Sequence, residues 1–375
     1  MEKSKGNKLR ILGLMTGTSA DGLDLCLVEF TDNGEKPGSS VLFSGEVDYP
    51  AKFKAAFRDP LELSDEEVAA LDKELGAWFA ESIAELNLSF DLIGSHGQTI
   101  RHEPPHFTQQ IGDPTFMANK FKVPVIYDFR SKDVELGGQG APLIPILDQY
   151  LYASLKHDIL CLNIGGISNI TLLPAGEKLL PIIAWDTGPG NTLIDKAVRS
   201  LTGGAHEFDP SGTIAQGGNL NESMLKHLLS HEFYKLSPPK SAGQEQFGLN
   251  YFKSIMSRYN SESNLNHEDI VLTLTVLTAR TITDSIKQLG EAYTPSTMYV
   301  SGGGTKNKTL MSLIQEALPE INCETVAKDG VTEDNKEAFG FAYLAYLRMN
   351  DLPGNIPTVT GASRPARLGK ICYPD

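Results

Sequence analysis

Runs of mainly apolar residues, separated by polar and glycine-rich turns, predict three consecutive β-strands within the first fifty positions. A long amphipathic stretch over 64–87 predicts a helix. It begins with Ser64-Asp-Glu-Glu67, which has the form of a capping box. The strands expected in this part of the chain are 9–16, 23–30, 40–48, 92–93 and 123–127.

The second half of the chain repeats this order of elements. Its expected strands are 159–164, 168–173, 181–185 and 297–300. After a helix expected at 145–154, its expected helices are 191–202, 220–230, 248–259, 267–289, one that follows 301–305 and runs to 318, and 333–349. Strands that alternate with helices indicate an α/β class with mixed sheets. The repetition suggests a duplicated domain.

Two domains fit the length of 375 residues, although no long linker marks a boundary. We expect an N-terminal lobe made of residues 1–130 and about 335–375, closed by the last helix. Residues 131–334 form the expected second lobe. The tail, 351–375, is rich in Pro and Gly and is expected to pack as an ordered loop.

The charge, the cysteines and the start of the chain limit which partners and which cell compartment we expect. The formal net charge of −14 gives no overall attraction to nucleic acid or to an anionic membrane, so we expect neither. The four cysteines are scattered without a CxxC pair, which argues against zinc or a redox pair, and Cys26 and Cys161 are expected in the core. The apolar run after the basic start is too short for a signal peptide, and we expect a cytoplasmic protein.

Two glycine-rich turns between apolar strands, about 150 residues apart, carry the first functional signal. Turns of this kind present backbone N–H groups without a side chain in the way, which suits phosphate oxygens. An ordinary hairpin turn also favours these residue types. The first turn lacks the Gly-Lys-Ser/Thr of a Walker A loop. The candidate ATP-binding residues are Gly17, Thr18, Ser19, Ala20, Asp21, Gly22, Leu23 and Asp24 in the first turn and Gly165, Gly166 and Asn169 in the second.

A strand followed by Asp186-Thr-Gly-Pro-Gly-Asn191 supplies the candidate catalytic base. A carboxylate at the end of a strand, beside a loop that can approach phosphate, is well placed to take a proton. The alternative is a helix-entry turn in which Asp186 is a local cap. An aspartic protease would need a second Asp-Thr/Ser-Gly, and none is present. From this segment we assign Asp186 to catalysis and Gly188, Gly190 and Asn191 to ATP binding.

A third glycine run, Gly302, Gly303 and Gly304, follows the strand at 297–300. Three glycines allow a flat adenine and its ribose to lie against the backbone. A tight connection from strand to helix would need one glycine. We therefore add these three residues to the ATP site.

Polar side chains after two further strands are candidates for substrate binding. His96 and Gln98 lie in Gly94-Ser-His-Gly-Gln, with Arg101 and His102 close behind. Arg130 follows the strand at 123–127 and suits a carboxylate, although a surface salt bridge is an equal explanation at this stage. Two His six residues apart match no common metal-ligand spacing.

Eight segments in order make the chain resemble the anhydro-N-acetylmuramic acid kinase family of the sugar-kinase/Hsp70/actin superfamily. The segments are GLMTGTSADGLD, IGSHGQTIRHEP, DFRSKDVELGGQGAPLIP, LNIGGISNIT, WDTGPGNTLID, VSGGGTKN, NKEAFGFAYLA and TGASRPARLGKICYP. The resemblance implies two actin-like (ribonuclease H-like) α/β domains with mixed sheets that flank a nucleotide cleft. It also implies ATP, Mg²⁺ that is carried by the ATP with no side-chain ligand assigned, and a possible homodimer.

The family opens the 1,6-anhydro bond of its sugar while it phosphorylates O6, in the recycling of peptidoglycan. Carried over to this sequence, Asp186 is the base that activates water, and residues 17–24 are the phosphate loop. Arg130 fits the lactyl carboxylate, and Glu337 fits a sugar-contacting carboxylate. The substrate-binding set is therefore Ser19, Asp21, His96, Gln98, Arg130 and Glu337.

Three other functions stay open from the sequence. A levoglucosan kinase acts on a related anhydrosugar without the lactyl and acetamido groups and shares this pattern. A conformational switch of the Hsp70 or actin kind would use ATP but leave the segment around His96 without a role. A hexokinase-like enzyme would phosphorylate an open hydroxyl without opening a ring.

Overall fold

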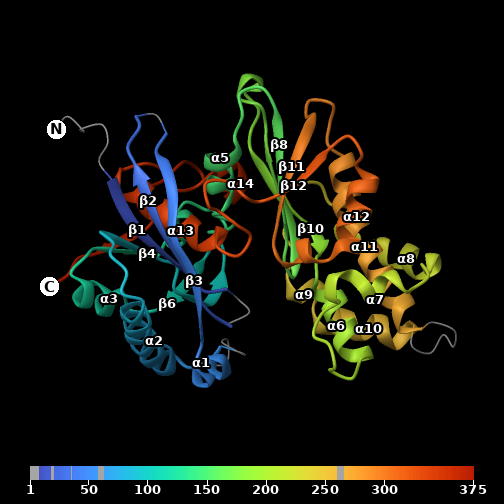
Figure 1. Cartoon of the computed structure of the whole chain (residues 1–375), viewed down its shortest axis with the longest axis horizontal. Coiled ribbons are helices and arrows are strands. Elements are labelled where there is room, and N and C mark those ends of the chain that lie inside the picture. The colour runs from blue at the N-terminus through green and yellow to red at the C-terminus, as the bar shows by residue number, and fades with distance from the viewer. Residues whose placement is uncertain (1–7, 18–20, 35, 58–62, 260–265) are drawn as a thin grey trace. The chain divides into compact units, whose positions relative to one another are not determined.

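A computed structural model describes residues 8–17, 21–34, 36–57, 63–259 and 266–375 (Figure 1). The chain divides into two compact units. Unit 1 comprises residues 1–147 and 327–375, and unit 2 comprises residues 148–326. The lobe boundaries expected from the sequence, 130/131 and 334/335, remain a proposal.

The sheet of unit 1 contains six strands in the order β13-β7-β4-β1-β2-β3. Antiparallel pairing of β1 with β2 and of β2 with β3 confirms the three-strand meander expected at the start of the chain. The strands β1, β4 and β7 run parallel, so the sheet is mixed. The bounds are β1 (Lys8–Met15), β2 (Gly22–Thr31), β3 (Gly38–Asp48), β4 (Leu92–Ser95), β7 (Val125–Tyr127) and β13 (Lys370–Cys372).

The sheet of unit 2 has the same topology. Its order is β10-β9-β8-β11-β12, with β8, β9 and β10 antiparallel and β8, β11 and β12 parallel. Numbered by chain order within each unit, both sheets read 3-2-1-4-5, and β13 adds a sixth strand to unit 1. The expected α/β duplication with mixed, actin-like sheets is confirmed. The bounds are β8 (Asp158–Ile164), β9 (Ile167–Leu173), β10 (Ile183–Pro189), β11 (Pro295–Ser301) and β12 (Asn322–Thr325).

Helices of unit 1 pack on its sheet through close backbone contacts. A Cβ atom at Gly13 of β1 would lie 2.0 Å from the Ala338 carbonyl oxygen, and one at Gly94 of β4 would lie 2.4 Å from that of Phe341. Only glycine therefore allows the last long helix, α13, to lie this close to the sheet. The remaining elements are α1 (Ala51–Ala56), α2 (Asp65–Glu85), the hairpin β5 (Gln98–Glu103) and β6 (Phe107–Ile111), α3 (Pro114–Phe121), α4 (Ser131–Glu135), α13 (Lys336–Met349) and α14 (Pro357–Thr360).

Two sequence expectations about unit 1 have clear outcomes. The capping box is confirmed, because the Ser64 hydroxyl accepts from the Glu67 N–H and the Glu67 carboxylate accepts from the Ser64 N–H. The tail was expected as a loop, but it also contains α14 and β13, which pairs with β7. Three residues are too few to give β13 a readable alternation, so only its partner strand defines it.

In unit 2 the buried helix α11 (His267–Lys287) is covered by shorter helices, and Figure 1 shows α6, α7, α8 and α10 beside it. Two apolar clusters form the interior: one among these helices and one between α11, α12 and the sheet. The bounds are α5 (Pro145–Tyr152), η2 (Gly176–Lys178), α6 (Thr192–Leu201), η3 (Pro210–Gly212), α7 (Thr213–Gln216), α8 (Glu222–Leu229), η4 (Glu232–Lys235), α9 (Gln244–Phe247), α10 (Leu249–Tyr259), η5 (Gly303–Lys306) and α12 (Lys308–Ala317).

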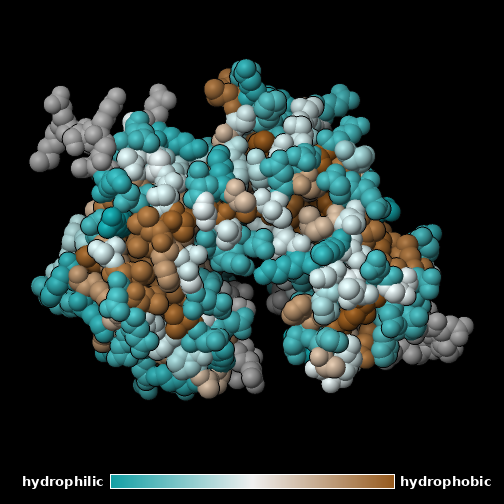
Figure 2. Space-filling view, in the orientation of Figure 1, coloured by the Kyte–Doolittle hydropathy of each residue, from teal (hydrophilic) through white to brown (hydrophobic). Residues whose placement is uncertain are grey.

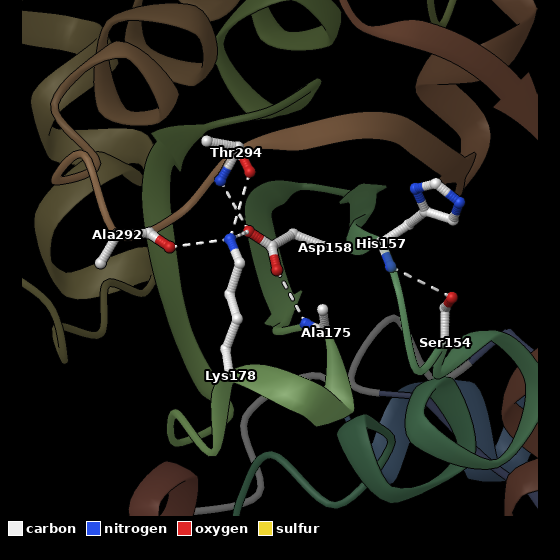
Figure 3. Close-up of polar contacts among 7 residues, drawn as sticks. All are labelled: Ser154, His157, Asp158, Ala175, Lys178, Ala292 and Thr294. Atoms are coloured by element: carbon white, nitrogen blue, oxygen red, sulfur yellow. Dashed lines mark hydrogen bonds and ion pairs between the residues drawn. The ribbon is translucent and has the colours of Figure 1, made fainter.

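A buried ion pair lies at the amino end of the β8 strand (Figure 3). The Asp158 carboxylate accepts from the Lys178 ammonium at 2.6 Å, from the Ala175 N–H at 2.7 Å and from the Thr294 N–H at 2.6 Å. The Lys178 Nζ also donates to the Ala292 carbonyl at 2.8 Å. Because a buried charge is tolerated when it is paired and hydrogen-bonded, this network stabilises three chain segments at the end of the sheet opposite the glycine turns.

The surface is mainly polar. Hydrophilic residues dominate the face in Figure 2, with smaller areas of exposed apolar residues. Within the described parts of the chain, no helix combines the length and the apolarity that spanning a membrane requires. Cys26 and Cys161 lie buried in β2 and β8, as expected of core residues.

Candidate active site

Four polar residues form a row across the sheet of unit 2. Asn163 of β8 pairs in register with Asn169 of β9, which pairs with Asp186 of β10. On the other side, Ser301 of β11 pairs with Asn163. Directly paired residues project from the same face of a sheet, so these side chains share one face. The row lies at the carboxyl ends of the parallel strands β8 and β11, where open α/β sheets bind ligands.

Asp186 is fixed by a neighbouring loop and by a bulge in its own strand. The Ala242 N–H donates to Asp186 Oδ2 at 2.7 Å, and the Asp186 N–H donates to the Lys240 carbonyl at 2.9 Å. The pairing of β10 with β9 shifts register between Asp186 and Gly188. A bulge of this kind re-aims the side chains next to it and is common beside active sites.

The pKa of Asp186 is raised to about 6, mainly by burial and in smaller part by the charge of Glu245. The Ala242 hydrogen bond and the charge of Lys240 act in the opposite direction. A base with a pKa near 6 is ionised at neutral pH and holds a proton more strongly than an ordinary aspartate. Asp186 therefore has the proton affinity expected of a general base working near neutrality.

The pH dependence of turnover follows from that pKa. A base must be ionised to accept a proton, so we expect kcat/KM to fall about tenfold per pH unit below about pH 6 and to level off above it. Asp24 also has a pKa raised to about 6. The profile of Asp24→Asn should keep its acidic limb near the same pH. If the fall of kcat/KM at acidic pH disappeared in Asp24→Asn, the titrating group would be Asp24 and not Asp186.

Two glycine turns of unit 2 are bound to each other. The Gly190 N–H donates to the Gly166 carbonyl at 2.8 Å, and the Asn191 N–H donates to the Gly165 carbonyl at 2.8 Å. The Asn191 side chain donates to the Ile164 carbonyl at 3.1 Å. These two N–H groups thus hold the turns together at the start of α6. A Cβ at Gly190 would lie 2.3 Å from the Gly165 oxygen, so this contact requires glycine.

The glycine run after β11 packs on the end of β8. A Cβ at Gly302 would lie 2.7 Å from the Ile164 carbonyl oxygen, and one at Gly304 would lie 2.3 Å from the Ile164 side chain. A Cβ at Gly303 would meet nothing closer than Asn191 Nδ2 at 3.8 Å. Packing therefore explains two of the three glycines, and Gly303 is the one with open space for a ligand.

In unit 1 the first glycine turn is held by buried polar side chains. The Gln98 amide donates to the Gly17 carbonyl at 3.2 Å and accepts from the Tyr49 hydroxyl at 3.2 Å. The Thr16 hydroxyl donates to the Gly97 carbonyl at 2.7 Å. Gln98 is 3% exposed, so its side chain is buried beneath this turn and supports it through these hydrogen bonds. Thr18, Ser19 and Ala20 lie outside the described residues.

The rest of that segment enters β2. Leu23 is fully buried in the core, and a Cβ at Gly22 would lie 2.6 Å from the Val47 carbonyl oxygen. Asp21 is exposed, and its carbonyl accepts from the Tyr49 N–H at 2.9 Å. Any contact of Gly22 or Leu23 with a nucleotide is therefore a backbone contact.

Asp24 stands in a group of acidic residues. It pairs in register with Met15 on one side and with Glu46 on the other. Its pKa is raised to about 6, mainly by burial and in part by the charges of Glu46, Glu337, Asp334 and Asp21. Like charges on neighbouring strands oppose folding unless a cation relieves them. Yet among the described residues, no three His, Cys, Asp or Glu side chains are grouped as ligands of one metal ion.

Arg130 and His96 form the centre of the other polar group of unit 1. Arg130 Nε donates to His96 Nε2 at 3.0 Å, and its NH1 donates to the Gly140 carbonyl at 2.7 Å. Among the described residues, the hydrogen bonds of Arg130 use Nε and NH1, so NH2 remains for a ligand. Burial lowers the pKa of Arg130 to about 10, a fall that Glu337 and Asp133 oppose. This environment excludes the surface salt bridge that the sequence left open.

His96 is held as one neutral tautomer. Burial lowers its pKa well below the ordinary value, and the charge of Arg130 lowers it further. Since Nε2 accepts from Arg130, the ring proton lies on Nδ1. That Nδ1 is buried, in a residue 4% exposed, and makes no full hydrogen bond with a described residue, although the nearby backbone of Thr16 and Gly97 acts to raise the pKa. An unpaired buried donor is costly, which favours a ligand oxygen beside it.

A buried aspartate supports this arrangement from behind. Asp133 is fully buried and accepts from the Asn355 side chain at 2.6 Å, from the Thr360 hydroxyl at 2.7 Å and from the Gly140 N–H at 2.8 Å. The Gly140 carbonyl in turn accepts from Arg130. The C-terminal segment thereby positions Arg130 through one carboxylate. The sequence pattern gave no sign of this connection.

Glu337 lies in the first turn of α13 with an exposed side chain. Desolvation by the surrounding protein raises its pKa, while Arg130 and Lys336 lower it. A raised pKa on an exposed carboxylate indicates a site surrounded by protein but open to solvent. Arg101 and His102 belong elsewhere: Arg101 pairs with Asp65 at 2.7 Å, and His102 Nδ1 bonds to the Thr108 hydroxyl at 2.9 Å.

The sequence as a whole matches the anhydro-N-acetylmuramic acid kinase family over residues 9–374. The chain belongs to this family. It is 39% identical to the anhydro-N-acetylmuramic acid kinase of Caldanaerobacter subterraneus subsp. tengcongensis, over 96% of both chains. The enzyme of Photobacterium profundum is also 39% identical, over 97% of this chain and 98% of its own. That of Bacillus thuringiensis subsp. konkukian is 35% identical, over 97% and 99%. The family resemblance drawn from the eight segments is confirmed.

Proposed function

We propose that the chain uses ATP and water to convert 1,6-anhydro-N-acetylmuramic acid into N-acetylmuramic acid 6-phosphate, in the recycling of peptidoglycan. Family membership supports the substrate and the kinase activity. The observation that carries the mechanism is Asp186, a carboxylate with a pKa of about 6 in a polar row at the ligand-binding edge of its sheet.

In the proposed reaction Asp186 takes a proton from a water molecule as the water oxygen bonds to C1 of the sugar. The bond between C1 and O6 breaks, and O6 bonds to the γ-phosphorus of ATP as ADP leaves. The products are the 6-phosphosugar, ADP and one proton. There is little covalent chemistry for the protein beyond this proton, so the other residues act mainly by positioning the reactants.

We assign the nucleotide to the glycine turns. In unit 1 these are residues 17–24, and in unit 2 they are Gly165, Gly166 and Asn169, the turn 188–191 and the run 302–304. Gly303 is the best candidate for contact with the adenosine, because open space lies beside it. Mg²⁺ carried by ATP would neutralise phosphate charge, and the acidic residues around Asp24 fit an ion that keeps several waters.

We assign the sugar to the polar group of unit 1. The NH2 group of Arg130 suits the lactyl carboxylate, and the Nδ1–H of His96 suits a second sugar oxygen. Glu337, Asp21 and Ser19 complete the proposed set, and Gln98 acts through the turn that it supports. A cytoplasmic location and a homodimer are further parts of the proposal.

Labelled water tests this function against its alternatives. In H₂¹⁸O the product should carry one ¹⁸O at C1, and ATP consumption should require the anhydrosugar. A hexokinase-like enzyme would leave C1 unlabelled, and an ATP-driven switch would consume ATP without sugar. Levoglucosan as a parallel substrate separates the two anhydrosugar kinases, because it lacks the lactyl group that Arg130 is proposed to bind. Product mass is the measurement.

A further inference from the structure

A cavity of about 380 Å³ in unit 1 lies outside the residues assigned to ATP and sugar. It combines residues from the start of α4, the end of α13 and the C-terminal tail. They include two cations of that tail, Arg367 and Lys370. The lining consists of Asp128, Ser131, Lys132, Glu135, Arg348, Arg367, Gly369 and Lys370.

Cationic groups outnumber anionic ones in this lining. Lys370 pairs with Asp128 at 2.8 Å and Lys132 pairs with Glu135 at 2.7 Å, so these four side chains neutralise one another. The other two cations, Arg348 and Arg367, share one carboxylate outside the cavity. Asp351 lies 2.7 Å from Arg367 and 3.8 Å from Arg348.

One positive charge therefore remains in a chain whose net charge is −14. The side chain of Arg348 is only 26% exposed. A partly buried guanidinium with a distant counter-ion is stabilised by an added anion. Guanidinium groups bind phosphate and carboxylate oxygens through paired N–H groups.

The lining is held in place by the backbone. Arg348 Nε donates to the Gly369 carbonyl at 2.8 Å. Gly369 has a φ of +92°, and a Cβ there would lie 2.6 Å from the Ile126 side chain. The next residue, Lys370, pairs in register with Tyr127 of β7. Arg348, at the end of α13, is thus bonded to the tail segment that carries Arg367, and this segment is packed against the sheet.

We propose that this cavity binds the phosphate group of a small phosphorylated molecule. Phosphate supplies the negative charge that two arginines sharing one carboxylate lack, and its oxygens match their donors. The volume lies in the range of small-ligand sites, so it leaves room for a sugar or nucleoside beside the phosphate.

A ligand in the cavity can affect the position of Arg130, because one short segment of chain connects the two. Asp128 lines the cavity with a φ of +53°, and only Phe129 separates it from Arg130. A ligand that draws Lys370 away from Asp128 would release a restraint on this segment. The resulting effect on the sugar rests on the substrate role proposed for Arg130, whereas phosphate binding does not.

The test is calorimetric titration of the full chain with inorganic phosphate, glucose 6-phosphate and AMP, with Mg-ADP present to fill the nucleotide site. Arg367→Gln should weaken binding of the preferred probe at least tenfold, and Arg367→Glu should abolish it. Arg364→Gln is the matched control, since Arg364 is an exposed arginine of the same tail that does not line the cavity. It should bind as the wild type does.

The probes also identify the source of the phosphate. Equal affinity for all three means that phosphate alone is recognised, and tighter binding of one organic phosphate means that its remainder also lies in the cavity. Hydrogen exchange over 125–131 should become faster with the probe in the wild type but not in Arg367→Gln, whose thermal melt checks its folding. Equal binding by the wild type and Arg367→Glu, or no binding of any probe at millimolar concentration, would overturn the proposal.

Discussion

Replacing Asp186 with Asn should lower kcat by at least about a hundredfold and up to about ten-thousandfold, the range that a general base contributes. Asparagine keeps the size of the side chain and can still accept from the Ala242 N–H, but it cannot take a proton from water. Affinity for ATP should stay within a few fold of the wild type, measured by titration. Asp284→Asn, which changes a partly exposed aspartate of the same unit that pairs with Arg280, is the control and should turn over normally.

The same variant should not be less stable at neutral pH. Between the ordinary aspartate pKa of 3.8 and about 6, folded Asp186 binds more protons than the unfolded chain does. This group therefore makes the free energy of unfolding fall as pH rises through that window, by at most about 3 kcal/mol. Asparagine has no charge to bury, so the variant does not lose this part of the free energy of unfolding. A melting temperature well below that of the wild type would mean that lost activity reflects damage to the fold.

Replacing Arg130 with Gln should lower kcat/KM for anhydro-N-acetylmuramic acid by about a hundredfold, because two charge-assisted hydrogen bonds are worth about 3 kcal/mol. Arg130→Lys keeps a charge without the planar fork and should lose less, about tenfold. The measurement is steady-state kinetics with this sugar and with 1,6-anhydro-N-acetylglucosamine, which lacks the lactyl group.

The second sugar makes the test specific. If Arg130 binds the lactyl carboxylate, both variants should act on the lactyl-free sugar nearly as the wild type does. Arg101→Gln, which removes an arginine that pairs with Asp65, should leave the ratio of the two sugars unchanged. An equal loss on both sugars would show that Arg130 supports the structure around His96 and Gly140 rather than the lactyl group.

The local pattern of apolar and polar residues was enough to predict most of the helices and strands. The meander at the start, the capping box at Ser64 and the repeated order in the second half were all found where sequence placed them. These features depend on contacts between near neighbours or on a strong alternation of apolar residues. The short strand β12 and the tail strand β13 were missed, because their residues are defined by distant partners. The hairpin β5–β6 was also missed although its strands are neighbours in the chain, because its polar residues do not show a clear alternation.

The chemistry of the candidate site was predictable only in part. A carboxylate after a strand identified Asp186, but its raised pKa depends on burial and on the loop that carries Ala242. The row of Asn163 and Asn169 beside it depends on strand register, which the sequence did not specify. Asp133 gave no sequence signal, since its partners lie more than 200 residues away at Asn355 and Thr360.

The central claim is that the carboxylate of Asp186 activates water at C1 of the sugar. A crystal structure with the anhydrosugar and a non-hydrolysable ATP analogue tests it most directly. The account predicts a water within about 2.6–3.2 Å of an Asp186 oxygen, on the side of C1 opposite O6. An Asp186 carboxylate turned into packed protein, with no path to C1, would contradict it.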